Sequence, residues 1–67
     1  MQNDPDKFND VIQRLKDEIA KLHREQDEAM KTAVYFGMTR QESQRYDERL
    51  DKIKSLVEQL ARMVKSN

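Results

Sequence analysis

The sequence predicts an all-α protein, an antiparallel two-helix hairpin of the coiled-coil type. Two observations predict this fold. Apolar residues recur at alternating spacings of four and three along nearly the whole chain, and this alternation keeps a narrow stripe on one side of a helix. The pattern is broken once, at the only glycine, Gly37. We therefore expect one long helix before this glycine and another after it.

The first helix is expected over about residues 5–36. Asp4 can accept hydrogen bonds from the first free amides, and Pro5 then takes the first helical position, where its missing N–H costs nothing. Gly37 supplies the left-handed residue that closes such a helix. The inward row of this helix is predicted to be Phe8, Ile12, Leu15, Ile19, Leu22, Gln26, Ala29 and Ala33.

The second helix is expected over about residues 40–65, after a turn at about residues 37–39. The segment Thr39–Glu42 has the pattern of a capping box, in which the first hydroxyl and the last carboxylate each satisfy a free amide. Because the turn is so short, this helix must return antiparallel to the first, and residues 1–67 make one helical-hairpin domain. Its inward row is predicted to be Tyr46, Leu50, Ile53, Val57, Leu60 and Val64.

Gln26 is the polar member of the first row, and the antiparallel register sets it opposite Leu50. We interpret it as a device that fixes the register of the two helices, as buried amides do in coiled coils; a ligand contact is the alternative. An amide that faces leucine is poorly satisfied. Replacing Gln26 by leucine is therefore expected to raise the stability by roughly 1 kcal/mol or more.

A charged fraction of 39% is typical of disordered chains, but the regular spacing of the apolar residues predicts helices instead. Pairs in which an acid precedes a base by four residues support a helix by about 0.2–0.5 kcal/mol each. We interpret the charges as the solvated faces of the two helices. The pairs are Asp10/Arg14, Asp17/Lys21, Asp27/Lys31, Glu48/Lys52 and Glu58/Arg62.

Composition excludes several classes of protein. Thirteen basic residues balance thirteen acidic ones, which argues against a chain built to coat nucleic acid or an anionic membrane. Cysteine is absent, so disulfides and cysteine-bound metals are excluded. No apolar run approaches the roughly 20 residues that span a bilayer, and the first residues lack the pattern of a secretion signal. We therefore expect a cytoplasmic protein.

Two helices alone bury only one face each, and a core of this size rarely supplies more than about 3–5 kcal/mol. Paired helices with apolar flanks commonly dock on a second pair, so we expect a homodimer that forms a four-helix bundle. The alternative is that the flanks bind a different protein. The predicted interface residues are Val11, Leu56 and Met63 near the open end, and Met30, Val34 and Phe36 near the turn.

The sequence offers little for catalysis. His23 is the only histidine, and together with Asp27 it gives two metal ligands where a structural zinc site needs four. The serines at positions 43, 55 and 66 lie on the second helix or its end, outside a rigid pocket that would activate a nucleophile. One glycine cannot build a phosphate-binding loop. We therefore predict no catalytic, metal-binding or cofactor-binding residues.

Residues Ala33–Thr39 look like the alanine-to-glycine core of a helix-turn-helix DNA reader. In that family the sixth position after the glycine is a buried aliphatic, whereas here it is Ser43. The family also needs a third helix and a basic recognition helix, and the bases of the second helix are spread around it. DNA binding is therefore the third of our functional hypotheses.

The stretch Gly37–Ile53 resembles the small sporulation aspartyl-phosphate phosphatases, two-helix hairpins of endospore-forming bacteria that dephosphorylate the sporulation response regulator. Leu50 and Asp51 fall at the same distance after the turn glycine as that family's Leu-Asp pair, and the family's Ser-Gln pair is replaced by Asp47-Glu48. The resemblance implies a polar side chain that orients water against a phosphate held by the regulator. The candidate contacts to a regulator are Gln41, Gln44 and Asp51.

These observations favour a small, non-catalytic protein-interaction or regulatory module that acts through helix-face contacts. The alternative is a phosphatase or modulator of a response regulator. The two hypotheses differ in one measurable respect, because only the second predicts that a regulator loses its phosphate on mixing.

Overall fold

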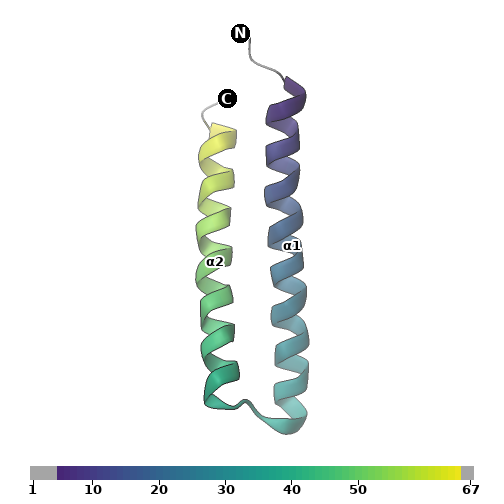
Figure 1. The fold of residues 1–67 in the computed structure, drawn as a ribbon, viewed down its shortest axis with the longest axis vertical. Helices are drawn as coiled ribbons and strands as arrows, with labels where there is room; N and C mark the ends of the chain where they lie inside the picture. The colour runs from purple at the N-terminus through teal and green to yellow at the C-terminus, as the bar shows by residue number, and fades with distance from the viewer. Residues whose placement is uncertain (1–4, 66–67) are drawn as a thin grey trace.

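The computed structural model describes the backbone of residues 5–65 and the side chains of residues 7–65. This part of the chain forms two helices, α1 (Pro5–Phe36) and α2 (Arg40–Lys65), joined by residues 37–39. Figure 1 shows the helices side by side and antiparallel, so that the first turns of α1 lie beside the last turns of α2. The hairpin is a rod of 53 × 17 × 15 Å. An all-helical architecture with two helices packed together is confirmed.

The end of α1 has the geometry that its residues favour. Gly37 adopts a φ of +74°, in the left-handed region that glycine enters without steric cost. Its amide donates a hydrogen bond to the carbonyl oxygen of Ala33, with 2.8 Å between nitrogen and oxygen, and this bond closes the helix. The expected cap at the other end of α1, Asp4, lies outside the described residues.

The capping box at the start of α2 is confirmed. The amide of Glu42 donates to the hydroxyl oxygen of Thr39 at 3.1 Å, and the amide of Thr39 donates to Oε1 of Glu42 at 2.9 Å. Both bonds satisfy amides that the first turn of a helix leaves free. The bond from the Thr39 amide is the main reason that the pKa of Glu42 is lowered, and the side chain of Thr39 and the charge of Arg45 add to it against slight desolvation.

Helix α1 turns the predicted row toward α2. Every residue of that row is buried or half-buried, from Phe8 near the open end to Ala33 near the turn. The most buried members are Leu22 and Gln26, whose exposed fractions are 5% and 6%. The alternation of four and three therefore identifies the inward face of α1 correctly.

The inward row of α2 differs from the prediction. Leu50, Val57 and Val64 are 39%, 46% and 59% exposed. The residues that precede each of them face α1 instead, so the helix is rotated about its axis relative to the predicted arrangement. The expected positions of Leu56 and Met63 beside the seam are therefore wrong, because both are half-buried within it. The observed inward row is Tyr46, Arg49, Ile53, Leu56, Leu60 and Met63.

Two lysines pair with carboxylates other than those expected. Nζ of Lys31 lies 3.9 Å from Oε1 of Glu28, rather than pairing with the carboxylate four residues before it. Nζ of Lys52 lies 3.8 Å from Oε2 of Glu18 on the other helix. Exposed pairs of this kind contribute at most about 1 kcal/mol each. The second pair is informative about geometry, because it sets one flank of α1 beside one flank of α2.

Candidate functional site

A polar contact lies in the seam between the helices. Nε2 of Gln26 donates to the carbonyl oxygen of Tyr46 at 2.9 Å. Nε of Arg49 donates to Oε1 of Gln26 at 2.6 Å, and a bond from a guanidinium is stronger than one between neutral groups. Both ends of the buried amide are thus satisfied. The expectation of a poorly satisfied amide opposite Leu50 is therefore wrong.

This contact explains the rotation of α2. In the predicted arrangement the amide of Gln26 would face a leucine, and an unpaired buried amide costs about 1–3 kcal/mol. The observed rotation brings Arg49 to the amide, while the aliphatic part of its side chain still covers apolar surface. Little apolar burial is lost, because Tyr46, Ile53 and Leu60 belong to both rows.

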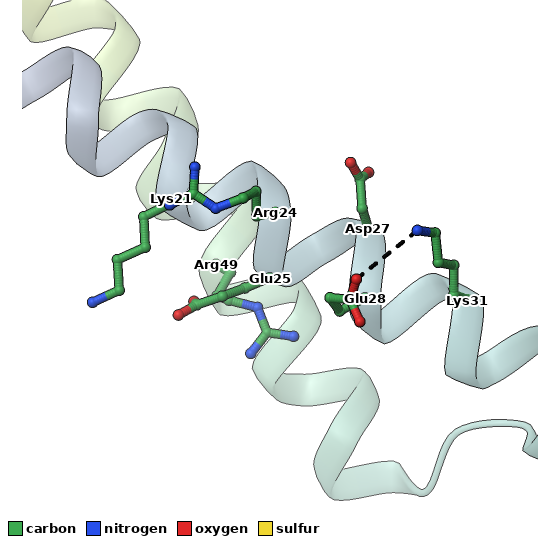
Figure 2. A pocket seen from close by; sticks show the side chains of 7 residues that line it. All are labelled: Lys21, Arg24, Glu25, Asp27, Glu28, Lys31 and Arg49. Carbon is green, nitrogen blue, oxygen red and sulfur yellow. Dashed lines mark ion pairs between the residues drawn. The ribbon is translucent and has the colours of Figure 1, made fainter.

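A shallow depression of about 610 Å³ lies beside the polar contact. Figure 2 shows that the charged ends of Lys21, Arg24 and Asp27 point in different directions, while Glu28 is engaged by Lys31. Divergent charges of both signs do not select a ligand of one sign. We therefore assign no ligand to this depression. Its lining residues are Lys21, Arg24, Glu25, Asp27, Glu28, Lys31 and Arg49.

A second hollow of about 260 Å³ lies between the helices near the turn, bordered by Gly37, Met38 and Arg45 among others. Two of the polar groups around it are engaged locally. The hydroxyl of Thr32 donates to the carbonyl oxygen of Glu28 at 3.0 Å, and the carboxylate of Glu42 accepts the capping bond. Among the described residues, neither hollow brings a nucleophile and a base together.

Four of the eight large apolar side chains that are exposed in the described chain lie on one side of the hairpin. Leu50, Val57 and Val64 recur every seven residues and form a straight row on the flank of α2 opposite to Lys52. Met30, which is 46% exposed, lies on the flank of α1 opposite to Glu18. Since Glu18 and Lys52 pair on one side, these two flanks share the other side. We call Met30, Leu50, Val57 and Val64 the apolar face.

A second apolar group lies at the end of α1. Val34, Tyr35 and Phe36 are 75%, 81% and 86% exposed. The rings of Tyr35 and Phe36 contact each other, with centroids 6.5 Å apart and planes inclined at 54°. Large aromatic side chains with this exposure are typical of surfaces that meet another molecule. We call these three residues the turn tip.

The structure distributes the predicted interface residues over several surfaces. Met30 lies on the apolar face, and Val34 and Phe36 lie at the turn tip. Val11 is exposed too, but it lies seven residues before Glu18 and thus on the side of the ion pair. Leu56 and Met63, as described above, lie in the seam, so the six residues do not form one surface. Their contact with a partner stays a prediction.

The candidate regulator contacts are accessible. Gln41, Gln44 and Asp51 are all exposed, and the last two are seven residues apart on the side of α2 directed away from α1. His23 is exposed on the same flank of α1 as Met30. The roles of Gln41, Gln44 and Asp51 in binding stay predictions.

Arg49 is the residue that sequence reasoning missed. A signal was present, because Tyr46, Arg49 and Ile53 begin a row with the same alternation of three and four as the predicted one. A charged residue within a row is ordinarily read as a break in it. Arg49 can occupy an inward position because its guanidinium bonds Gln26 on the facing helix. The two residues together therefore indicate this contact, whereas neither one does so alone.

Within residues 5–65, neither helix carries an apolar stretch long enough to cross a membrane. The same part of the chain holds no group of three or more His, Cys, Asp or Glu side chains arranged to bind a metal ion. Comparisons with models of protein families, with curated proteins and with solved structures find no match for this chain.

Proposed function

We propose that this chain is a protein-interaction module that acts through helix-face contacts, without catalysis of its own, and that it works as a homodimer. One observation carries the proposal: large apolar side chains remain exposed outside a seam that is itself mostly half-buried. Leu22 and Ile53 are the buried hydrophobic residues of the described chain, whereas eight large hydrophobic side chains are exposed in it. Exposed apolar patches commonly mark sites of protein contact.

The size of the core supports self-association. Apart from Leu22 and Ile53, the apolar side chains of the seam are only half-buried, and domains of this length commonly gain stability by oligomerising. Covering an exposed Leu, Val or Met fully contributes about 1.5–3 kcal/mol. A second hairpin on the apolar face would cover several such side chains at once and form a four-helix bundle.

Sedimentation velocity and thermal unfolding over a range of concentrations test the proposal. We expect a dimer at roughly tens of micromolar and a melting temperature that rises with protein concentration, because dissociation accompanies unfolding. The proposal fails if the chain sediments as a monomer throughout and its melting temperature ignores about a hundredfold dilution.

A response regulator is a second candidate partner. The observation that favours it is the exposure of Gln44 and Asp51 on one side of α2, which leaves their polar groups accessible to a docking protein. If the chain acts as the resemblance implies, mixing it with a phosphorylated regulator removes the acyl phosphate, and Gln44→Ala slows the loss. An unchanged lifetime of the phosphate excludes this role. DNA binding stays a prediction, which a salt-sensitive shift of duplex DNA tests.

A further inference from the structure

Charged side chains accompany the apolar row on α2. Asp47 lies three residues before Leu50, and Lys54 lies four residues after it and three before Val57. Residues at these spacings are neighbours on a helix surface. Both side chains are exposed. The apolar side of α2 therefore carries an acid on the turn side of Leu50 and a base on its open-end side. Arg40, one heptad before Asp47, is a further base at the start of the helix.

Helix α1 repeats this order on the same side of the hairpin. Lys16 lies two heptads before Met30 and so on the same row, and Asp27 lies three residues before Met30. Both charged side chains are exposed. Since α1 runs toward the turn, its acid is again nearer the turn and its base nearer the open end.

The contacts between the helices align these charges. Gln26 bonds the carbonyl of Tyr46, so their next neighbours Asp27 and Asp47 lie at about one level along the rod. We call this pair the acidic level.

The two bases are aligned in the same way. Glu18 pairs with Lys52, so Lys16 and Lys54, each two residues further from the turn, also lie at about one level. We call this pair the basic level. The point midway between the two levels is close to Leu50 on α2.

We propose that a second copy of this chain docks on the apolar face with its turn at the opposite end, about a two-fold axis that crosses the hairpin near Leu50. The geometry rests on the proposed homodimer and defines it further. Rotation about this axis stacks α1 on α1 and α2 on α2, and it brings the acidic level of each copy onto the basic level of the other. Each favourable charge pair then occurs twice, as an isologous interface requires.

The apolar side chains match under the same rotation. Leu50 of one copy lies next to Leu50 of the other, at the axis. Val57 is one heptad from the axis toward the open end, at the level at which α1 of the other copy carries Met30. Because α2 stacks on α2, these two side chains lie diagonally across the proposed bundle. A face of 53 by 17 Å is also of the size that a stable interface uses, which is about 800 Å² per partner.

The reverse arrangement, with both turns at one end, conflicts with the charges. A two-fold axis along the rod would set each acidic level against the acidic level of the other copy and each basic level against the basic one. Like charges placed together across an interface disfavour that complex. The order of charges along the rod therefore selects the arrangement with the turns apart.

Disulfide cross-linking tests the axis directly, because the chain contains no cysteine. Leu50→Cys is expected to form a covalent dimer readily under mild oxidation, since the two copies of this position meet at the axis. Val64→Cys is the matched control, because its copies lie roughly 40 Å apart along the rod. If the turns lay together, both positions would be equally far from their copies, and equal cross-linking of the two variants would overturn the proposal.

Charge exchange tests the pairing of the levels. Asp47→Lys and Lys54→Asp are each expected to raise the dimer dissociation constant by about tenfold, because each variant replaces two attractions with two repulsions. The double variant, which exchanges the two charges, is expected to return to within about threefold of the original value. Glu48→Lys is the control and should leave the constant unchanged, because Glu48 is exposed and lies four residues before Lys52, on the flank of α2 that carries the ion pair. A double variant as weak as the singles would contradict the pairing.

The outcomes separate this proposal from the one on which it rests. A chain that is monomeric in every sample overturns both the homodimer and its geometry. A chain that dimerises, yet cross-links equally at positions 50 and 64, retains the homodimer and overturns only the docking described here.

Discussion

Helices α1 and α2 are both amphipathic, yet their sequences determine their orientation to different degrees. α1 carries one row with the alternation of four and three, and this row faces α2. α2 carries two such rows, which share Tyr46, Ile53 and Leu60 and differ in the positions between them. Periodicity cannot choose between rows of equal regularity. The choice is made by the other helix, where Gln26 needs a polar partner.

The largest expected effect tests the row of α1. Leu22→Ala should lower the free energy of unfolding by about 2–5 kcal/mol, because the side chain is 5% exposed and its removal leaves a cavity in the seam. Denaturant unfolding followed by circular dichroism measures the change. A cost below that of Val34→Ala, at an exposed position of the same helix, would mean that this row is not the buried one.

The matched test on α2 compares two leucines in the two competing rows. Leu56→Ala should cost more than Leu50→Ala when both are measured at concentrations low enough for the chain to be monomeric, because Leu56 lies in the seam and Leu50 is 39% exposed. A larger loss of stability for Leu50→Ala than for Leu56→Ala would mean that the row predicted from the sequence, which contains Leu50, faces α1 after all.

The next effect concerns the polar contact that chooses the row. Arg49→Leu should lower the stability by about 1–3 kcal/mol, because it leaves Oε1 of Gln26 buried without its donor. Gln26→Leu alone should not raise the stability as the sequence predicted, since it removes an amide whose two ends are both hydrogen-bonded. The double variant should recover most of the loss, because replacing both partners leaves no polar group unpaired.

A double-mutant cycle from urea denaturation measures the coupling between the two side chains. If the effects of the two single variants simply add, Gln26 and Arg49 do not interact in solution, and the rotation of α2 needs another cause.

Local signals were sufficient for the ends of the helices and insufficient for the packing between them. Gly37 and the capping box from Thr39 to Glu42 are decided by neighbours along the chain, so the turn could be read from the sequence. The partner of Gln26 lies 23 residues away, and no local pattern indicates it. The apolar face was missed for the same reason, because Leu50 is exposed only once α2 has rotated to bring in Arg49.

The turn should affect stability without changing which row faces inward. Gly37→Ala is expected to lower the stability by about 1 kcal/mol, because its φ of +74° strains an L-residue, although an added methyl group would meet nothing within 4 Å. D-alanine at this position, introduced by chemical synthesis, is the control. It adopts a positive φ without strain and restricts the unfolded chain, so it should be at least as stable as glycine. Equal losses for the two enantiomers would exclude strain as the cause.

The smallest expected effect is the pH dependence of the capping box, because the cap at the start of α2 contains a group that titrates and the closing bond of α1 does not. Hydrogen bonds from Thr39 lower the pKa of Glu42 below its ordinary value of 4.5, so the folded chain favours the charged carboxylate. The contribution of this group to stability is therefore fully present above pH 4.5, and it is lost as the pH falls through the lowered pKa. The bond that closes α1 joins backbone groups and does not titrate.

A carbon-detected NMR titration of Glu42 should give a midpoint below the ordinary value, and Thr39→Ala should move it upward. Glu42→Gln should remove this part of the pH dependence of unfolding. A midpoint at or above 4.5 would mean that the capping box is not formed in solution, and the start of α2 would then be no better defined by its local sequence than its rotation is.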